Sequence, residues 1–207
     1  MTELMVNVAA TCSGTRALGP GLRAVAWVQG CPFRCAGCIA PEWIPQNRKT
    51  LMTADDLATT LLADRAVTGL TFSGGEPMAQ AAALARVAEL ARASRDLTLI
   101  CFTGYTLAEL RTRPPAPGVA DLLAQTDVLI DGRYVAARDD DLGLRGSSNQ
   151  QVHYLTGRLA DQADVFEAGP RRSEIRLAER SALLVGVPGL AIKTAFARLS
   201  EKASDCQ

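Results

Sequence analysis

Short aliphatic runs alternate along the chain with segments of helical periodicity. The first clear run, Leu22–Val28, follows a Gly-Pro-Gly turn and stops at Gly30. Similar runs predict further strands at Val67–Phe72, Leu97–Phe102 and Val128–Ile130. Strands that alternate with helices are typical of a parallel sheet with helices packed on it.

The predicted helices lie between these strands. A Thr and an Asp three residues apart resemble a capping box and open a helix over Thr53–Asp64. The glycines and proline of Ser73–Pro77 fit a tight turn followed by the first turn of another helix. Helical periodicity returns in Leu107–Leu110 and Val119–Ala124. Each strand is thus predicted to end in a loop that leads into helical material.

The last third of the chain has a different pattern. Asp139–Gln150 is polar and rich in glycine and serine, which predicts a loop. Two short runs beyond it, Glu174–Leu177 and Ala182–Val187, predict a hairpin. A last helix is expected over Leu190–Ala203.

Length and composition limit the architecture and the partners. The chain has 207 residues, of which 48% are hydrophobic, enough for one substantial core but not for two full-sized domains. We expect a core domain over residues 1–156 and a C-terminal extension over 157–207 packed on it. Lys plus Arg and Asp plus Glu both number 22, without a basic face for nucleic acid. Because neither a signal-peptide pattern nor a long apolar run is evident, we expect a cytoplasmic protein without a membrane span.

Three of the six cysteines, Cys31, Cys35 and Cys38, lie within eight positions. In a reducing compartment such a cluster points to metal rather than to disulfides. Three thiolates on one short loop can bind one metal centre but leave one coordination position open. On spacing alone, a structural zinc site completed by a distant ligand such as His153 is a competing interpretation.

The three-then-two spacing of these cysteines resembles the signature of the radical S-adenosylmethionine (SAM) superfamily. That superfamily has a SAM-binding GGE segment at the end of the next strand, where this chain has residues 74–77, Gly-Gly-Glu-Pro. More segments resemble the anaerobic ribonucleotide reductase activating family, which activates glycyl radical enzymes: Gly19–Arg23, Thr103–Thr106, Leu129–Arg133 and Arg145–Gln150. The resemblance covers roughly residues 19–155.

This resemblance implies an α/β fold, a partial (β/α) barrel of the radical SAM type with a small C-terminal hairpin and helix. It implies that Cys31, Cys35 and Cys38 hold a catalytic [4Fe-4S] cluster whose open iron binds SAM. An electron from a flavodoxin- or ferredoxin-type donor would cleave SAM to methionine and a 5'-deoxyadenosyl radical. The radical would take a hydrogen atom from a glycine Cα of a partner enzyme such as anaerobic ribonucleotide reductase.

The strand-end segments supply the first set of expected SAM-binding residues. Gly74 and Gly75 would let backbone polar groups approach the methionyl part of SAM without a side-chain clash. Glu76 would form an ion pair with the ammonium group of SAM, and Pro77 is the last expected residue of this binding segment. Thr103, in one of the matching segments, is expected to bind SAM as well.

A second set follows the later strands. By resemblance to pyruvate formate-lyase activating enzyme, Asp131 would orient the SAM carboxylate, directly or through a monovalent cation, with Arg133 as its charge partner. A solvated Asp-Gly turn is the alternative interpretation. Ser147 and Asn149 are expected to contact SAM or substrate, and an ordinary polar loop is the alternative there.

Two departures from the family pattern leave other functions open. Gly37 stands before the third cysteine, where many radical SAM proteins have an aromatic residue that contacts adenine, so another residue must supply that contact. Ile39 and Ala40 follow the third cysteine where relatives usually have histidine or tyrosine and then asparagine. One alternative is a radical SAM enzyme that modifies a ribosomal peptide or small metabolite. The other is a non-catalytic zinc-binding interaction module.

Overall fold

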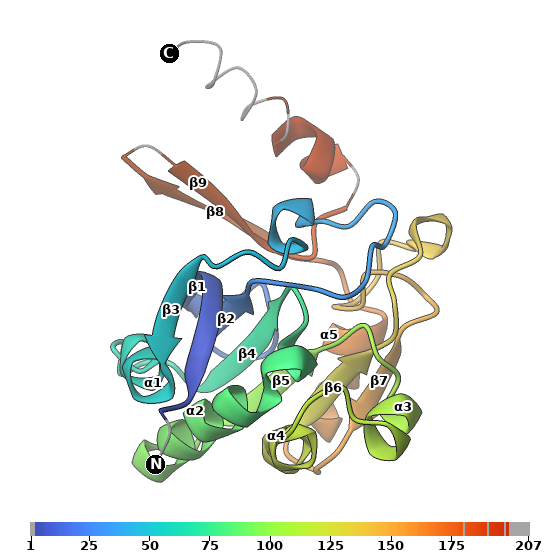
Figure 1. Cartoon of the computed structure of the whole chain (residues 1–207). Helices are drawn as coiled ribbons and strands as arrows, with labels where there is room; N and C mark the ends of the chain where they lie inside the picture. Colours follow the sequence, from blue (N-terminus) through green and yellow to red (C-terminus); the bar gives the residue numbers. More distant parts are fainter. Residues whose placement is uncertain (1–2, 180, 190, 197, 199–207) are drawn as a thin grey trace.

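The computed structural model describes residues 3–179, 181–189, 191–196 and 198 (Figure 1). A seven-stranded mixed sheet runs through it in the order β3-β1-β2-β4-β5-β6-β7. Its strands are β1 (Met5–Thr15), β2 (Arg23–Val28), β3 (Thr50–Thr53), β4 (Gly69–Gly74), β5 (Thr98–Phe102), β6 (Val128–Asp131) and β7 (Gln151–Tyr154). The central strands β2, β4, β5 and β6 are parallel, whereas β1 and β7 run antiparallel to their neighbours.

Helices cover one face of this sheet, as Figure 1 shows. They are α1 (Ala54–Leu61), α2 (Ala81–Ser94), α3 (Leu107–Thr112) and α4 (Val119–Gln125), whereas α5 (Ala163–Glu167) lies apart from them. Leu57, Leu84 and Leu122 of the covering helices are fully buried in one core with Phe72 of β4. On the other face of the sheet, Phe166 of α5 packs in a separate buried cluster with residues of β5 and β6.

The four parallel strands confirm the predicted apolar runs to within two residues at each end. Thr53 is the N-cap of α1, because its hydroxyl oxygen accepts a hydrogen bond from the backbone N–H of Asp56 at 3.0 Å. The expected α/β class is therefore confirmed. The sheet is open along β3 and β7 in the part of the chain that the structure describes, so a closed barrel is not formed there.

Three strands and one helix were not predicted. In β1, Val6 and Val8 are buried, but polar or half-exposed residues stand between and after them. β3 and β7 have four residues each, and α5 has five. The short elements bury too little apolar surface to stand out in the sequence, whereas β1 is long and internal to the sheet but lacks a continuous apolar run.

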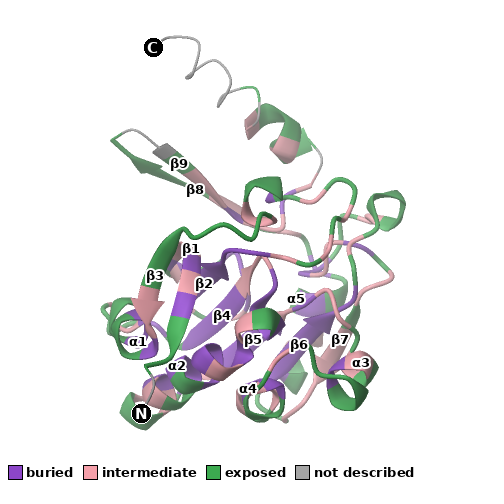
Figure 2. Ribbon diagram, in the orientation of Figure 1, coloured by how far each residue is buried: buried purple, intermediate pink, exposed green. Residues whose placement is uncertain are grey.

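After α5, β8 (Ser173–Ala178) and β9 (Ser181–Gly186) form a separate hairpin, as predicted. Figure 2 shows that its outer part is exposed. Leu177 is 81% exposed, whereas Val185 is fully buried. Residues 191–196 are helical, while residues 190, 197 and 199–203 of the predicted last helix lie outside the described residues. None of the helices that the described residues form is long and apolar enough to cross a membrane.

A buried arginine joins the amino ends of the central strands. Arg23, the first residue of β2, is fully buried, and its guanidinium donates to the hydroxyl oxygens of Thr71 at 2.7 Å and Thr98 at 3.0 Å. It also donates to the carbonyl oxygens of Pro20, Leu70 and Thr98. Burial lowers the pKa of Arg23 to about 9, so the group is still protonated at neutral pH. One charged side chain therefore ties β2, β4 and β5 together.

Candidate active site

A cavity of about 280 Å³ lies at the carboxyl ends of the parallel strands, where α/β sheets bind their ligands. Each of the four strands leads into a segment that lines it. These segments are the cysteine loop after β2, residues 73–76 at the end of β4, residues 102–104 at the end of β5 and residues 132–134 after β6.

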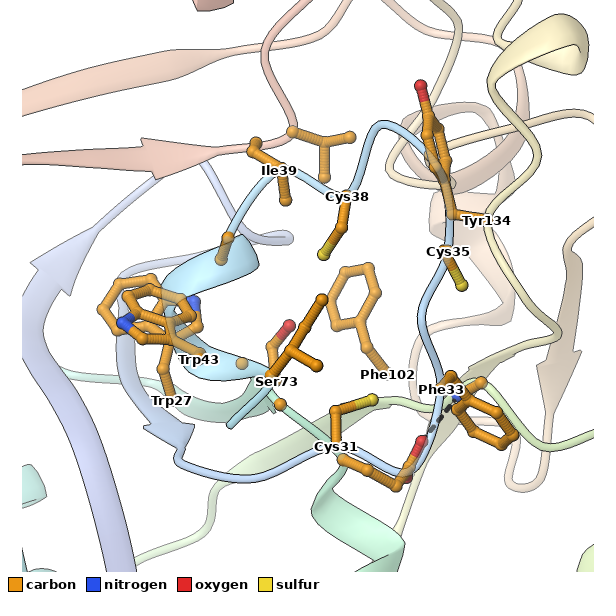
Figure 3. Close-up of a pocket in the computed structure, with 18 of the residues that line it drawn as sticks. Trp27, Cys31, Phe33, Cys35, Cys38, Ile39, Trp43, Ser73, Phe102 and Tyr134 are labelled. Carbon is orange, nitrogen blue, oxygen red and sulfur yellow. Dashed lines mark hydrogen bonds between the residues drawn. The ribbon is translucent and has the colours of Figure 1, made fainter. Parts of the chain in front are cut away.

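The cysteine loop places all three predicted ligands on this cavity. Backbone hydrogen bonds fix its start, from Gly30 to the Trp43 carbonyl at 2.9 Å and from Cys31 to the Ile44 carbonyl at 3.0 Å. Figure 3 shows the sulfurs of Cys31 and Cys38 inside the loop, while the Cys35 sulfur points away from them. A change of the Cys35 rotamer is therefore needed to bring the three thiols to one cluster.

Burial favours the protonated form of two of these thiols, Cys31 and Cys38. It raises the pKa of Cys31 to about 11 and also raises the pKa of Cys38. Iron binding would release these protons, because thiolates rather than thiols bind metals. Among the described residues, no three Cys, His, Asp or Glu side chains stand close enough to hold a single metal ion. The three half-buried thiols on one cavity nevertheless suit a cluster, because each thiolate would bind a different iron atom and the three need not meet at one point.

The structure gives Gly74 and Gly75 a role that the sequence interpretation did not anticipate. A Cβ on Gly74 would lie 2.5 Å from the backbone nitrogen of Val28, and one on Gly75 would lie 2.3 Å from the carbonyl oxygen of Gly30. Gly74 also has a φ of +104°, which disfavours other residues. Both glycines line the cavity, but the end of β2 and the start of the cysteine loop already require them.

Glu76 lines the cavity and is 1% exposed. Its carboxylate accepts hydrogen bonds from the backbone N–H groups of Met78 at 2.9 Å and Gly104 at 2.8 Å, and from the Thr103 hydroxyl at 2.8 Å. Burial raises the pKa of Glu76 to about 7, against the effect of these three donors. Glu76 and Thr103 therefore join the segments that follow β4 and β5, in addition to facing the cavity.

The structure separates the expected pair of Asp131 and Arg133. Asp131 does not line the cavity, and its carboxylate accepts from the Leu107 N–H at 2.6 Å and lies 2.8 Å from Nε2 of His153. Arg133 does line the cavity, with its guanidinium carbon 4.6 Å from the centre of the Phe33 ring. The single histidine thus pairs with Asp131 rather than with the cysteines.

Three further expected residues lie outside the cavity lining. Ser147 is fully buried, and its hydroxyl oxygen accepts from the backbone N–H of Val135 at 3.1 Å. Asn149 donates to the carbonyl oxygen of Arg133 at 2.9 Å, and Pro77 is buried in the turn after β4. The structure does not bring these three side chains to the cavity.

An apolar wall of the cavity was missed in the sequence. Trp27 and Trp43 line it with their ring centres 5.7 Å apart, next to Phe102 at the end of β5 (Figure 3). The C-terminal extension adds Leu183, Leu184, Gly186, Val187, Lys193 and Phe196. The two tryptophans flanking the cysteines were an available signal. The contribution of the extension depends on long-range packing, and no pattern in the sequence indicated it.

Comparison with known proteins first defines the class. A family model described as a 4Fe-4S single cluster domain matches residues 17–153, which contain the cysteine loop and all four parallel strands. The cysteine loop on a strand-end cavity agrees with this description. The protein is therefore an iron–sulfur protein, which argues against the zinc-binding interaction module.

Individual relatives then narrow this class. The anaerobic ribonucleoside-triphosphate reductase-activating protein of Vibrio cholerae is 35% identical over 67% of this chain and 91% of its own length. Its Escherichia coli counterpart is 33% identical over 66% of this chain and 91% of its own length. A pyruvate formate-lyase-activating enzyme of Clostridium pasteurianum is 35% identical over 59% of this chain and 49% of its own length. The chain belongs to the family of radical SAM enzymes that activate glycyl radical enzymes.

Proposed function

We propose that this protein cleaves SAM reductively at a [4Fe-4S] cluster held by Cys31, Cys35 and Cys38. The cluster supplies an electron that breaks a carbon–sulfur bond of SAM, giving methionine and a 5'-deoxyadenosyl radical. The radical then takes a hydrogen atom from a glycine Cα of a partner enzyme such as anaerobic ribonucleotide reductase, leaving a glycyl radical and 5'-deoxyadenosine. The observation that carries this proposal is the set of three cysteines on one loop at a strand-end cavity.

The polar side of the cavity is the proposed SAM site. Gly74, Gly75, Glu76 and Thr103 line it, and the two glycines leave backbone polar groups accessible. The carboxylate of Glu76 can offset the ammonium charge of SAM. Because Glu76 already accepts three hydrogen bonds, its position is set before any ligand arrives.

Arg133 is better placed than Asp131 to meet the SAM carboxylate. Arg133 is a cation on the cavity wall, and its guanidinium lies over the Phe33 ring. The Asp131 carboxylate, by contrast, already accepts a hydrogen bond at the N-terminus of α3 and contacts His153. In this proposal Asp131, Ser147 and Asn149 position loops around the site rather than bind SAM or a monovalent cation. Asn149 acts through its hydrogen bond to the Arg133 backbone.

The remaining parts of the proposal follow from the family. In this proposal the open mixed sheet belongs to a partial (β/α) barrel of the radical SAM type, with residues 1–156 as its core domain. A flavodoxin- or ferredoxin-type protein supplies the electron, and the reaction takes place in the cytoplasm, where free thiols persist. The apolar wall of Trp27, Trp43 and Phe102 keeps water away from the radical.

The first test measures the cluster and SAM cleavage together. Protein reconstituted anaerobically with iron and sulfide should convert SAM to 5'-deoxyadenosine when dithionite is the reductant. Replacing Cys31, Cys35 or Cys38 by Ala should abolish both iron incorporation and this product. Cys12→Ala and Cys101→Ala are the matched controls, because both side chains are buried away from the cavity, and they should retain both. Bound zinc without iron, and no product, would contradict the proposal.

The second part of the test identifies the substrate. Reduced protein, SAM and a glycyl radical enzyme from the same genome should give a glycyl doublet in electron paramagnetic resonance. Deuterium on the glycine Cα of the partner should appear in 5'-deoxyadenosine. Transfer of deuterium from a ribosomal peptide or a metabolite instead would show that the activating role is wrong while SAM cleavage is right.

A further inference from the structure

The C-terminal extension forms a second wall of the cavity, opposite in character to the polar SAM side. Figure 1 shows β8 and β9 beyond the carboxyl ends of the central strands, next to the cysteine loop. The extension contributes Leu183, Leu184 and Val187 from the hairpin and the segment after it, and Lys193 from the helical residues 191–196. The family match ends at residue 153, so this wall lies outside the matched region.

Two sets of contacts fix the hairpin to the core. Val185 of β9 is fully buried in a cluster with Leu18 and Trp27. On β8, the Glu174 carboxylate accepts from the Arg16 backbone N–H at 2.9 Å. The neighbouring Arg176 donates to the Gly14 carbonyl oxygen at 2.9 Å. The hairpin is therefore held in place over the end of β1.

A buried arginine anchors the segment that leads into the hairpin. The side chain of Arg171 is 4% exposed and lies 2.8 Å from an oxygen of Asp139. It also donates to the carbonyl oxygens of Arg145 at 2.8 Å and Gly146 at 3.2 Å. Asp139 accepts a hydrogen bond from the hydroxyl of Tyr134 at 3.0 Å. A Cβ on Gly37 of the cysteine loop would lie 3.5 Å from the Tyr134 ring, so this anchor reaches the active site.

The chemistry of the two walls differs. Thiols, backbone polar groups and Glu76 line the SAM side. Among the described residues of the extension, Lys193 is the only charged group that lines the cavity, and its ammonium lies 3.6 Å from Asp139. The second wall is therefore apolar with its one cation paired, which suits an uncharged polypeptide segment and disfavours a phosphorylated metabolite.

We propose that Leu183, Leu184 and Val187 form the substrate-selecting wall of this enzyme. They would exclude water and charged compounds and admit an uncharged, slender segment of the partner to the SAM side. This inference rests on the proposed function, because it assigns a polypeptide substrate to the same site. It adds that a region outside the family match determines which substrate is accepted.

The test uses two cross-strand neighbours of the hairpin. Leu184 of β9 faces Ile175 of β8 in the register, but only Leu184 lines the cavity, and Ile175 is 50% exposed. Leu184→Arg should lower the yield of partner glycyl radical by about tenfold or more, the scale of discrimination that a pocket supplies. Formation of 5'-deoxyadenosine without substrate should fall by much less than the radical yield, because Leu184 lies on the wall away from the polar SAM side. Ile175→Arg is the matched control and should change neither quantity.

A second variant distinguishes a loss of substrate binding from a loss of folding. Leu184→Ala removes contact area without adding charge, and it should lower the glycyl radical yield by a few-fold with normal iron content. The inference is wrong if Leu184→Arg keeps the wild-type radical yield, or if SAM cleavage and radical yield fall together in both variants. Failure of the proposed function is distinguishable, because the wild-type protein itself would then form no 5'-deoxyadenosine.

Discussion

The close approach of Gly75 to Gly30 leads to a prediction about the assembly of the active site. In Gly75→Ala, the new Cβ would stand 2.3 Å from the carbonyl oxygen of Gly30 and 2.7 Å from its carbonyl carbon. Both contacts are to backbone, so neither can be relieved by a side-chain rotation. Gly30 directly precedes Cys31, and the displacement is therefore transmitted to the first proposed cluster ligand.

The magnitude follows from the cost of overpacking. An extra methyl group in a closely packed position costs about 1–3 kcal/mol. For a chain of this length, about 2 kcal/mol corresponds to a fall in melting temperature of about 4–8 °C. Thermal unfolding of the apoprotein, followed by circular dichroism, measures this effect. Iron and sulfide content after reconstitution should fall as well, because Cys31 is displaced.

Gly157→Ala is the matched control. A Cβ on Gly157 would meet no atom within 4 Å, so this variant should unfold within about 0.5 kcal/mol of the wild type. Equal melting temperatures for Gly75→Ala and the wild type would refute the structural role of this glycine. A loss of SAM binding at unchanged stability and iron content would instead support the original expectation of direct contact with SAM.

Two further predictions concern charged groups. Because the pKa of Glu76 is raised to about 7, the folded apoprotein retains a proton that the unfolded chain releases near pH 4.5. Its free energy of unfolding should therefore fall by about 3 kcal/mol as pH rises from 4.5 to 7, and urea titrations of Glu76→Gln should lack this slope. Arg171→Met should cost about 3 kcal/mol in urea unfolding, because it leaves Asp139 without its buried partner, and a change below about 0.5 kcal/mol would contradict the anchor.

The sequence predicted the central strands because they are buried on both faces. Such strands are continuous apolar runs, and β2 is buried at all six positions. The cysteine loop could also be predicted, because three cysteines within eight positions are rare and their spacing indicates metal ligands. Parallel strands place their carboxyl ends on one edge of the sheet, which explains why the segments after β2 and β4 meet at one cavity.

The features that the sequence did not show depend on contacts between distant parts of the chain. Asp131 and Arg133 are two positions apart in the sequence, yet only Arg133 lines the cavity, because Asp131 is bound to Leu107 and His153. The close packing of Gly75 against Gly30 depends on the pairing of β4 with β2. The second cavity wall depends on the burial of Val185 more than 150 residues after the core residue Leu18. A local sequence pattern contains no information about these long-range contacts.

The two ends of the central sheet differ in mechanical character. At the amino ends, Arg23 links three strands through hydrogen bonds in the interior. At the carboxyl ends, the chain turns at Gly30, Gly74 and Gly132, all with positive φ. The N–H groups of Gly75 and Glu76 also donate to the carbonyl oxygens of Val28 and Gly30, so main chain holds β2 to the segment after β4. At the amino ends the link therefore depends on one side chain, whereas beside the cavity it belongs to the backbone and depends on side chains only where glycine is required.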